Sequence, residues 1–231
     1  MRNHVGAILW KQCKDTLKNK TILIQFLMFP VMTVIMEHAI EIPGMPKHFF
    51  ANLFAVMYIG MAPLTSMAAV ISEEKEKNTL RVLQMCNVKA LEYLFGNAVY
   101  MLIMCMAGSL VIGLAGGYGG KDLVFFMLVM LLGHSIATLL GAAIGAVSKN
   151  QMMATSVTVP VMMILSFLPM LSMFNETIGK VSKYIFSGQL HLMINGIGSM
   201  QLGLENIAIL GGNIVLVLVA FLVAYKKAFA N

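Results

Sequence analysis

Six stretches of mostly apolar residues divide the chain, and each is long enough to cross a lipid bilayer as a helix. A spanning helix needs about 20 such residues, because the hydrocarbon core of a bilayer is about 30 Å thick. The stretches lie near residues 21–40, 50–71, 93–117, 123–147, 152–174 and 205–225. This pattern predicts an all-α integral membrane protein with six transmembrane helices in a single domain, residues 1–231.

The composition agrees with this pattern. Hydrophobic residues make up 59% of the 231 residues and charged residues 11%, whereas a soluble domain carries about 25% charged residues on its surface. The net charge is +6, but the basic residues lie between apolar stretches without interleaved aromatic residues. We interpret the excess as a topology signal that also attracts anionic lipid headgroups, and we expect membrane lipids and no nucleic acid as partners.

The distribution of Lys and Arg predicts the orientation of the spans. Twelve of the 16 basic residues lie in the segments 1–20, 72–92, 148–151 and 226–231, and four lie in the segments on the opposite side. Because cytoplasmic loops are enriched in Lys and Arg, both termini are predicted to be cytoplasmic. No small-x-small cleavage pattern follows the first span, so we expect this span to remain uncleaved.

The N-terminal segment, residues 1–20, combines apolar and basic side chains. Val5, Ile8 and Leu9 precede a basic stretch in which three lysines recur at helical spacing. This pattern predicts an amphipathic helix at the membrane interface, and the alternative is a basic tail that only sets topology. The residues assigned to the interfacial helix are Trp10, Lys11, Lys14 and Lys18.

Residues 72–92 form the one sizeable loop predicted on the cytoplasmic side. Glu73 and Lys77 are spaced for an i,i+4 ion pair in its favourable order. Leu80 and Leu83 then fall along one helical face. A charged turn followed by a partly apolar face favours a short helix that docks on another protein. The alternative is a solvated helix that holds the loop against the lipid surface.

This loop resembles the cytoplasmic loop of ABC-2-type permeases, the membrane subunits of one class of ATP-driven exporters. The usual pattern there is a charged run, then Gly-Thr-Leu, a polar residue, a Leu and a later Pro. Asn78 stands at the Gly position and Asn87 at the Pro position, and Asn tolerates the left-handed conformation better than most residues. The matching residues are Glu73, Glu74, Glu76, Thr79, Leu80 and Leu83.

The resemblance extends to the order of segments along the chain, and it implies a function. In the family this loop docks on a separate ATPase subunit and transmits its movement, so this chain would bind no cofactor and the partner would bind ATP and Mg²⁺. The family's segment before the last span turns back into the outer leaflet, as residues 175–204 would. The residues assigned to ATPase coupling are Glu73, Glu74, Glu76, Lys77, Thr79, Leu80, Arg81 and Leu83.

The resemblance also implies a second permease copy, in a homodimer or a heterodimer, around a central pathway. The short single-domain kind looks like exporters of amphipathic peptide toxins or antimicrobial peptides in the bacterial plasma membrane. We expect the second and fifth spans to line the pathway, because Met side chains accept varied apolar partners; the alternative for each Met is ordinary packing or lipid contact. The candidate pathway residues are Met57, Thr65, Ser66, Met153, Met162, Met163 and Met170.

The fourth span carries small residues at four-residue spacing. Gly133, Ala137, Gly141 and Gly145 form a ridge that lets another helix approach closely, from the same chain or from another. His134 lies near the middle of this span, where a charge is costly to bury. We expect it to make a hydrogen bond between helices rather than to relay protons.

Catalytic motifs are weak in this sequence. Residues 116–121 end in Gly-Gly-Lys but lack the first Gly and the final Ser or Thr of a nucleotide-binding loop, and they predict a turn. Ser135 lies in a Gly-His-Ser-Ile-Ala context, so an intramembrane serine protease is one alternative, and a stand-alone secondary transporter is another. The three cysteines have no regular spacing and predict no disulfide framework or metal site.

Overall fold

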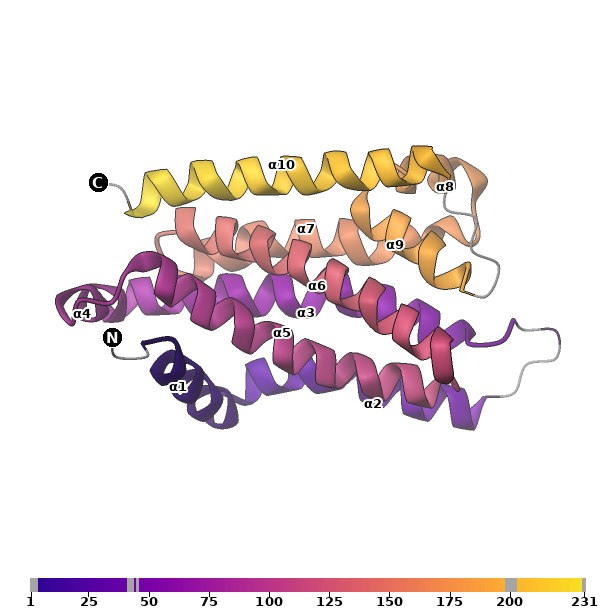
Figure 1. Cartoon of the computed structure of the whole chain (residues 1–231), viewed down its shortest axis with the longest axis horizontal. Helices are drawn as coiled ribbons and strands as arrows, with labels where there is room; N and C mark the ends of the chain where they lie inside the picture. The colour runs from indigo at the N-terminus through magenta and orange to yellow at the C-terminus, as the bar shows by residue number, and fades with distance from the viewer. Residues whose placement is uncertain (1–3, 41–43, 45, 198–202, 230–231) are drawn as a thin grey trace.

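The computed structural model describes residues 4–40, 44, 46–197 and 203–229, and its long helices run roughly parallel to one axis (Figure 1). No strand occurs among these residues. Six helices are long and apolar enough to cross a membrane, which confirms the predicted all-α membrane class. They are α2 (Lys20–Ala39), α3 (Phe49–Glu76), α5 (Ala90–Ala115), α6 (Gly120–Val147), α7 (Gln151–Ser172) and α10 (Leu204–Phe229).

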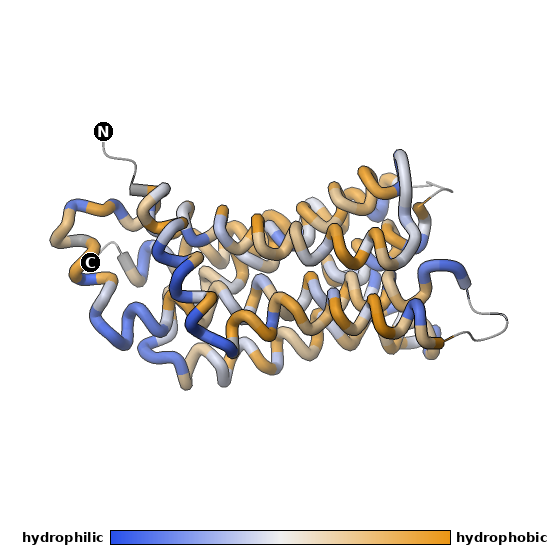
Figure 2. The backbone as a smooth tube through the Cα atoms, turned by 90° about the horizontal axis from the view of Figure 1, so that it is seen from below, coloured by the Kyte–Doolittle hydropathy of each residue, from blue (hydrophilic) through white to orange (hydrophobic). Residues whose placement is uncertain are grey.

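Four shorter helices lie toward the two ends of this bundle. At one end, which we call the α4 end, lie α1 (His4–Lys18), α4 (Thr79–Met85) and both chain termini (Figure 1). At the opposite end, the α9 end, lie α8 (Glu176–Ser182) and α9 (Phe186–Asn195). Hydrophilic positions gather toward the two ends, and the strongly apolar positions occupy the length between them (Figure 2). Residues 1–3 of the predicted interfacial segment lie outside the described residues, as do residues 198–202 of the predicted re-entrant segment.

Helix α3 is the centre of the bundle. It is the most buried of the six long helices, and it packs against α2, α5, α6, α7 and α9. A Cβ atom added at Gly141 of α6 would lie 2.5 Å from the carbonyl oxygen of Leu64 in α3, and one at Gly60 of α3 would lie 2.4 Å from the hydroxyl of Ser166 in α7. The small-residue ridge of α6 therefore receives a helix of the same chain, which the sequence left open.

The loop predicted at residues 72–92 is shorter than expected. Helix α3 continues to Glu76, so the acidic run belongs to the last turn of a spanning helix rather than to a separate loop helix. Only α4 and the turns that flank it lie between α3 and α5. Charged residues in the last turn did not end the helix, because Glu and Lys are good helix formers.

The connection between α5 and α6 is the tight turn that the sequence predicted. Gly117 has a φ of +77° and Gly120 has a φ of +56°. Both angles lie in the left-handed region that glycine adopts without steric cost. The glycines therefore serve a change of chain direction, and no nucleotide-binding loop is formed.

The segment between α7 and α10 turns into the bundle and back. Leu190 of α9 is fully buried, and its side chain lies against Gly133, thirteen residues beyond the start of α6. Asn195, near the end of α9, accepts a 2.8 Å hydrogen bond from the Asn52 amide near the start of α3. Helix α9 thus runs from inside the bundle toward its end, an arrangement that fits a re-entrant segment.

Candidate functional site

The last turn of α3 and helix α4 form a charged segment at the α4 end, which we call the coupling segment (residues 73–85). Its first ion pair joins Glu73 and Lys77, whose side chains are 2.5 Å apart at i,i+4 spacing. This hydrogen bond to Glu73 raises the pKa of Lys77. Because the Lys77 side chain is 66% exposed, the pair is a surface pair that adds little to stability.

Glu74, the next residue, points the other way and is buried. Its carboxylate accepts hydrogen bonds from the Lys11 ammonium and, at 3.1 Å, from the Gln12 amide, both in α1. Glu74 is only 7% exposed and Gln12 only 2% exposed. A buried carboxylate with charge-assisted partners holds its position strongly, so Glu74 fastens α1 to the end of α3.

The following two residues reach two more helices. The Lys75 ammonium donates a 2.5 Å hydrogen bond to the carbonyl of Ala146 in the last turn of α6. The Glu76 carboxylate accepts a 2.9 Å hydrogen bond from the backbone N–H of Gln151, the first residue of α7. Each charge complements the dipole of the helix end that it meets, positive at a C-terminus and negative at an N-terminus.

Three consecutive residues of α3 therefore hold three different helices. Glu74 binds α1, Lys75 binds α6 and Glu76 binds α7. A displacement of this turn would pull on all three helices at once. Sequence spacing could not show this arrangement, because it gives the face of each residue on α3 but not the helix that lies opposite.

Helix α4 presents a surface that differs from the predicted one. Leu80 is 9% exposed and belongs to the core, and Leu83 is partly buried against that core. These two leucines therefore face this chain rather than a partner, because their face of α4 is the one that packs on the bundle. The exposed side chains of α4 and its following turn include Arg81, Val82, Met85, Cys86 and Asn87.

Two asparagines shape the turns around α4. Asn78, next to the partly buried Thr79, has a φ of +57°, and Asn87 has a φ of +63°. Asn78 thus adopts the left-handed conformation, which Asn tolerates better than most residues. A proline, with φ fixed near −65°, could not adopt the conformation of Asn87. The turn after α4 therefore differs from one built on the family's usual Pro.

Helix α1 packs on the bundle through one face and exposes the other. Ile8 is buried and fits against Gly96 of α5, where a Cβ atom would lie 2.9 Å from its side chain. On the exposed face, the Lys14 ammonium lies 5.0 Å from the centre of the Trp10 ring, and Lys18 is also exposed. Of the predicted interfacial residues, Lys11 differs in turning inward to Glu74.

A cavity of about 580 Å³ lies between α1, the start of α2 and the coupling segment. Its walls are mostly charged or polar, and they include Lys11, Glu74, Lys77 and Thr79. These residues come from both α1 and the coupling segment, so the cavity separates parts of the two elements beside the contact at Glu74.

One stripe of α3 remains uncovered by other helices. Between residues 51 and 72, the partly exposed positions follow helical spacing on a single face and are Leu53, Phe54, Met57, Met61, Thr65 and Ala69. Helix α2 lies along one side, where the Phe29 and Phe54 rings are 6.2 Å apart. Helix α7 lies along the other, where Ser166 donates a 3.3 Å hydrogen bond to the carbonyl of Met57.

The candidate pathway residues of α3 divide between this stripe and the core. Met57 and Thr65 lie on the stripe, whereas Ser66 is fully buried. Thr65 and Ser66 both donate hydrogen bonds to the Gln25 side-chain oxygen of α2, over 3.1 and 2.9 Å. Ser66 therefore joins α3 to α2 and does not line an open surface in this chain, because the neighbouring Gln25 covers it.

The methionines of α7 also divide. Met163 is 51% exposed and Met153 is 41% exposed, while Met162 and Met170 are partly buried. At about 100° per residue, Met162, Met163 and Met170 lie within about 60° of Ser166, the residue that faces the stripe of α3. Met153 lies about 140° away from Ser166 on the helix. Three of the four methionines thus share the flank nearest the stripe.

The polar groups inside the spans make contacts between helices. The ring Nε2 of His134 lies 2.8 Å from the hydroxyl of Ser109 in α5, which confirms the expected hydrogen bond between helices. The Ser135 hydroxyl donates to the carbonyl of Leu131 within its own helix. Among the described residues, no hydrogen bond joins Ser135 to a histidine, so the structure does not assemble the base that a serine nucleophile needs.

Comparison with known proteins agrees with this geometry. A family model described as ABC-2 family transporter protein matches residues 6–224, which is nearly the whole chain. The match includes α1 except its first two residues, the coupling segment and all six long helices except the last few residues of α10. No curated protein matches the chain in a direct comparison.

Proposed function

Because this chain belongs to the ABC-2 transporter family, and is therefore a permease subunit that works with an ABC ATPase, we propose that it exports an amphipathic substrate from the cell. The substrate class we favour is a peptide toxin, an antimicrobial peptide or a similar molecule. ATP and Mg²⁺ bind to the separate ATPase subunit, and this chain contributes no cofactor.

The observation that carries the proposal is the triple connection of Glu74, Lys75 and Glu76. A permease must convert movement of its ATPase into movement of its spans, and a connection to one helix would move that helix alone. Here one turn of α3 holds α1, α6 and α7 through charge-assisted hydrogen bonds. A movement of the coupling segment is therefore transmitted to three helices.

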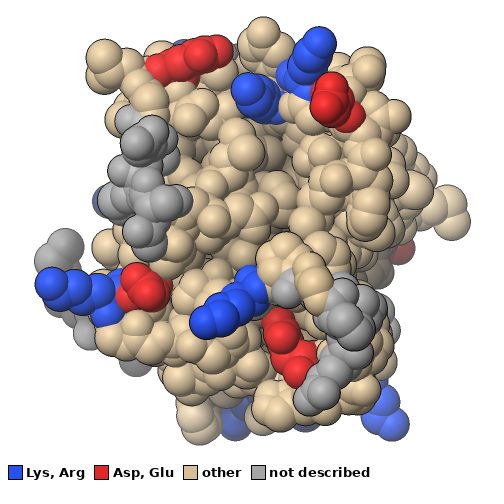
Figure 3. Space-filling view, turned by 90° about the vertical axis from the view of Figure 1, so that its right-hand side faces the viewer, with Lys and Arg blue, Asp and Glu red and all other residues tan. Residues whose placement is uncertain are grey.

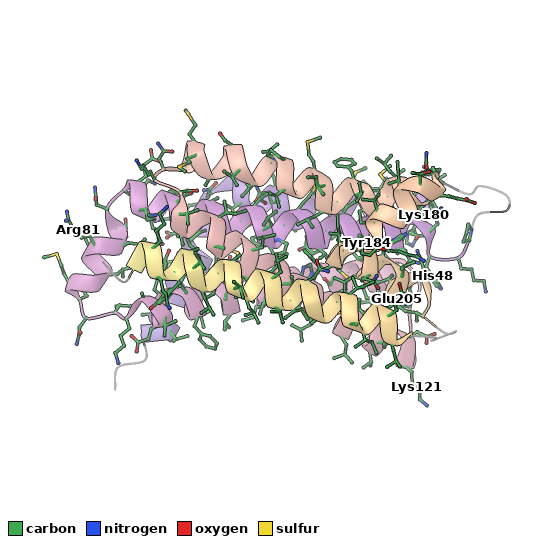
Figure 4. The ribbon with its side chains drawn as sticks, turned by 90° about the horizontal axis from the view of Figure 1, so that it is seen from above. His48, Arg81, Lys121, Lys180, Tyr184 and Glu205 are labelled. Atoms are coloured by element: carbon green, nitrogen blue, oxygen red, sulfur yellow. The ribbon has the colours of Figure 1, made fainter. Side chains whose placement is uncertain are left out.

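We place the contact with the ATPase subunit on the exposed face of α4. Arg81 projects from the α4 end, away from the bundle (Figure 4). Val82 is 56% exposed and Met85 is 84% exposed, so the same face also carries large apolar side chains. An exposed basic residue beside apolar anchors suits a protein interface, where aromatic residues, Met and Arg are enriched. Leu80 contributes by fixing α4 to the bundle.

We infer the orientation of the chain in the membrane from the features of the α4 end. Both termini lie at the α4 end (Figure 1), and so does most of the basic charge, which favours a cytoplasmic position. The α9 end then faces the outside of a bacterial plasma membrane. Lys121, Lys180 and Glu205 lie at that end, opposite Arg81 (Figure 4).

The stripe of α3 is where we place the pathway. It is a largely apolar surface with Met57, Met61 and the hydroxyl of Thr65 along it. Two copies of the chain meeting across this face would enclose it between α2 and α7 of each copy. At the α9 end, where a substrate would leave, most of the surface is uncharged, and the Lys, Arg, Asp and Glu side chains are confined to a few small groups (Figure 3). An amphipathic substrate suits such a route.

The test uses the chain together with its ATPase subunit in lipid vesicles. We expect Met85→Glu to abolish the substrate-stimulated part of ATP hydrolysis, because it places a charge on the apolar face of α4. Lys121→Glu, a charge change at the opposite end, should leave that stimulation unchanged. Equal losses in the two variants, or no loss in either, would contradict the assignment of α4 as the coupling surface.

A further inference from the structure

An apolar groove on the lipid-facing side of the bundle is separate from the coupling segment and from the stripe of α3. It is a cavity of about 310 Å³ whose floor is formed by α6, with Thr138 and Ala142, and whose walls are formed by Phe95 and Ala98 of α5 and by Phe221 of α10. Helices α5 and α10 each pack against α6, so the groove runs along α6 between them.

We propose that this groove binds one acyl chain of an anionic phospholipid. The groove extends along α5 from Leu91 to Leu102, which is about 16 Å at 1.5 Å per residue. Half of a hydrocarbon core of about 30 Å is about 15 Å. The groove therefore matches the depth of a single leaflet, and its nearly wholly apolar lining suits a hydrocarbon chain.

The charges at the ends of the helices that form the groove would select the headgroup. The start of α5, the end of α6 and the end of α10 all lie at the α4 end (Figure 1). Lys89 immediately precedes α5, and Lys226 and Lys227 lie in the last turn of α10; all three are exposed. Glu92 is the nearby acidic residue, and its carboxylate accepts a hydrogen bond from the backbone N–H of Lys89.

No ion pair joins these three lysines to a carboxylate among the described residues. Basic groups close to an apolar groove at the membrane surface are the arrangement that binds anionic lipid headgroups. Each lysine near the lipid surface is worth about 1 kcal/mol, or about fivefold in binding. A zwitterionic lipid offers the same acyl chain but no net charge for these lysines.

The single tryptophan of the chain makes a direct test possible. In a Trp10→Phe background, Phe221→Trp places a fluorophore in the groove wall, and Phe167→Trp places one on α7, outside the groove, at a site that is 37% exposed. The protein is reconstituted in vesicles that contain brominated phosphatidylglycerol or brominated phosphatidylcholine. Bromine on the acyl chain quenches tryptophan fluorescence on contact.

We expect brominated phosphatidylglycerol to quench the Phe221→Trp protein at an about 100-fold lower lipid fraction than brominated phosphatidylcholine, because the contributions of the three lysines, about fivefold each, multiply. The Phe167→Trp protein should be quenched equally by both lipids. Adding Lys226→Gln and Lys227→Gln should reduce the preference at Phe221→Trp by about fivefold for each lysine. Adding Ala98→Phe, which fills the groove, should reduce quenching by both lipids.

Equal quenching of the Phe221→Trp protein by the two lipids would overturn the anionic selectivity. A preference that is not reduced by the loss of both lysines would overturn the headgroup site, and quenching that Ala98→Phe leaves unchanged would overturn binding of the acyl chain in the groove. Because both leaflets carry the probe lipid and no transport is measured, the result is independent of the proposed orientation and export activity.

Discussion

Glu74 and Glu73 are neighbouring carboxylates whose contacts differ, and the comparison of Glu74→Gln with Glu73→Gln tests how α1 is held. Glu74 is 7% exposed, and its carboxylate accepts hydrogen bonds from Lys11 and Gln12 of α1. Among the described residues, Glu73 forms an ion pair only with Lys77, which follows the last residue of α3 at the surface. The same chemical change therefore removes a contact between helices at one position and a surface pair at the next.

The expected magnitudes follow from these environments. Hydrogen bonds to a charged group are worth about 1.5–3 kcal/mol. Since Lys11 remains 34% exposed and water screens part of its interaction, we expect Glu74→Gln to weaken the docking of α1 by about 2 kcal/mol. That loss raises the population of undocked α1 about 30-fold. A surface i,i+4 pair is worth about 0.3–0.5 kcal/mol. Since Glu73 does not contact α1, Glu73→Gln should raise the population of undocked α1 by about twofold at most, even if the whole energy of the pair were transmitted to α1.

Limited trypsin digestion of the protein in lipid nanodiscs measures this population. Trypsin cuts at Lys14 and Lys18 of α1 when the helix opens locally, and with fast reclosing the rate of cutting follows the open population. We expect cutting within α1 to accelerate strongly in Glu74→Gln and slightly in Glu73→Gln. Equal acceleration in the two variants would refute the role assigned to the buried carboxylate.

Three further predictions concern packing and turns. Gly141→Ala should lower the thermal unfolding midpoint in detergent, because its Cβ atom would lie 2.5 Å from the backbone of α3 and overpacking costs about 1–3 kcal/mol. The control Gly211→Ala, at a position with open space around the added Cβ atom, should not lower the midpoint. Leu80→Ala should destabilise the protein by about 2–4 kcal/mol in the same measurement, as truncation of a buried leucine usually does, whereas Met85→Ala, at an 84% exposed site, should leave the midpoint unchanged. A lower midpoint for Met85→Ala than for Leu80→Ala would contradict the faces of α4 assigned to these two side chains. Asn78→Ala should cost about 1–2 kcal/mol at a φ of +57° and Asn78→Gly should not, and equal midpoints for the two variants would contradict the left-handed turn.

The spans could be predicted from the sequence because each depends on local composition. About 20 apolar residues in a row satisfy the bilayer wherever they lie in the bundle. The turn at Gly117 and Gly120 was predictable for a similar reason, since glycine is the residue that adopts a positive φ without strain.

The contacts between helices could not be predicted in the same way. Glu73 and Glu74 are adjacent and chemically identical, and only the placement of α1 makes one buried and the other exposed. Leu80 was expected to face a partner because it lies on an apolar face of α4, but that face packs on the bundle. An apolar helical face predicts burial without specifying the surface that buries it.

The most direct test of the account asks whether α4 touches the ATPase subunit. Cys86 is exposed beside α4, Cys13 is exposed on α1 and Cys105 is buried, so a photoreactive maleimide attached to a Cys13→Ser protein labels Cys86 selectively. On illumination of the assembled transporter, the account predicts a covalent adduct between this chain and the ATPase subunit, and no adduct when Cys86→Ser is added. Efficient labelling of Cys86 without any ATPase adduct, or labelling of Cys86 only from outside intact cells, would contradict it.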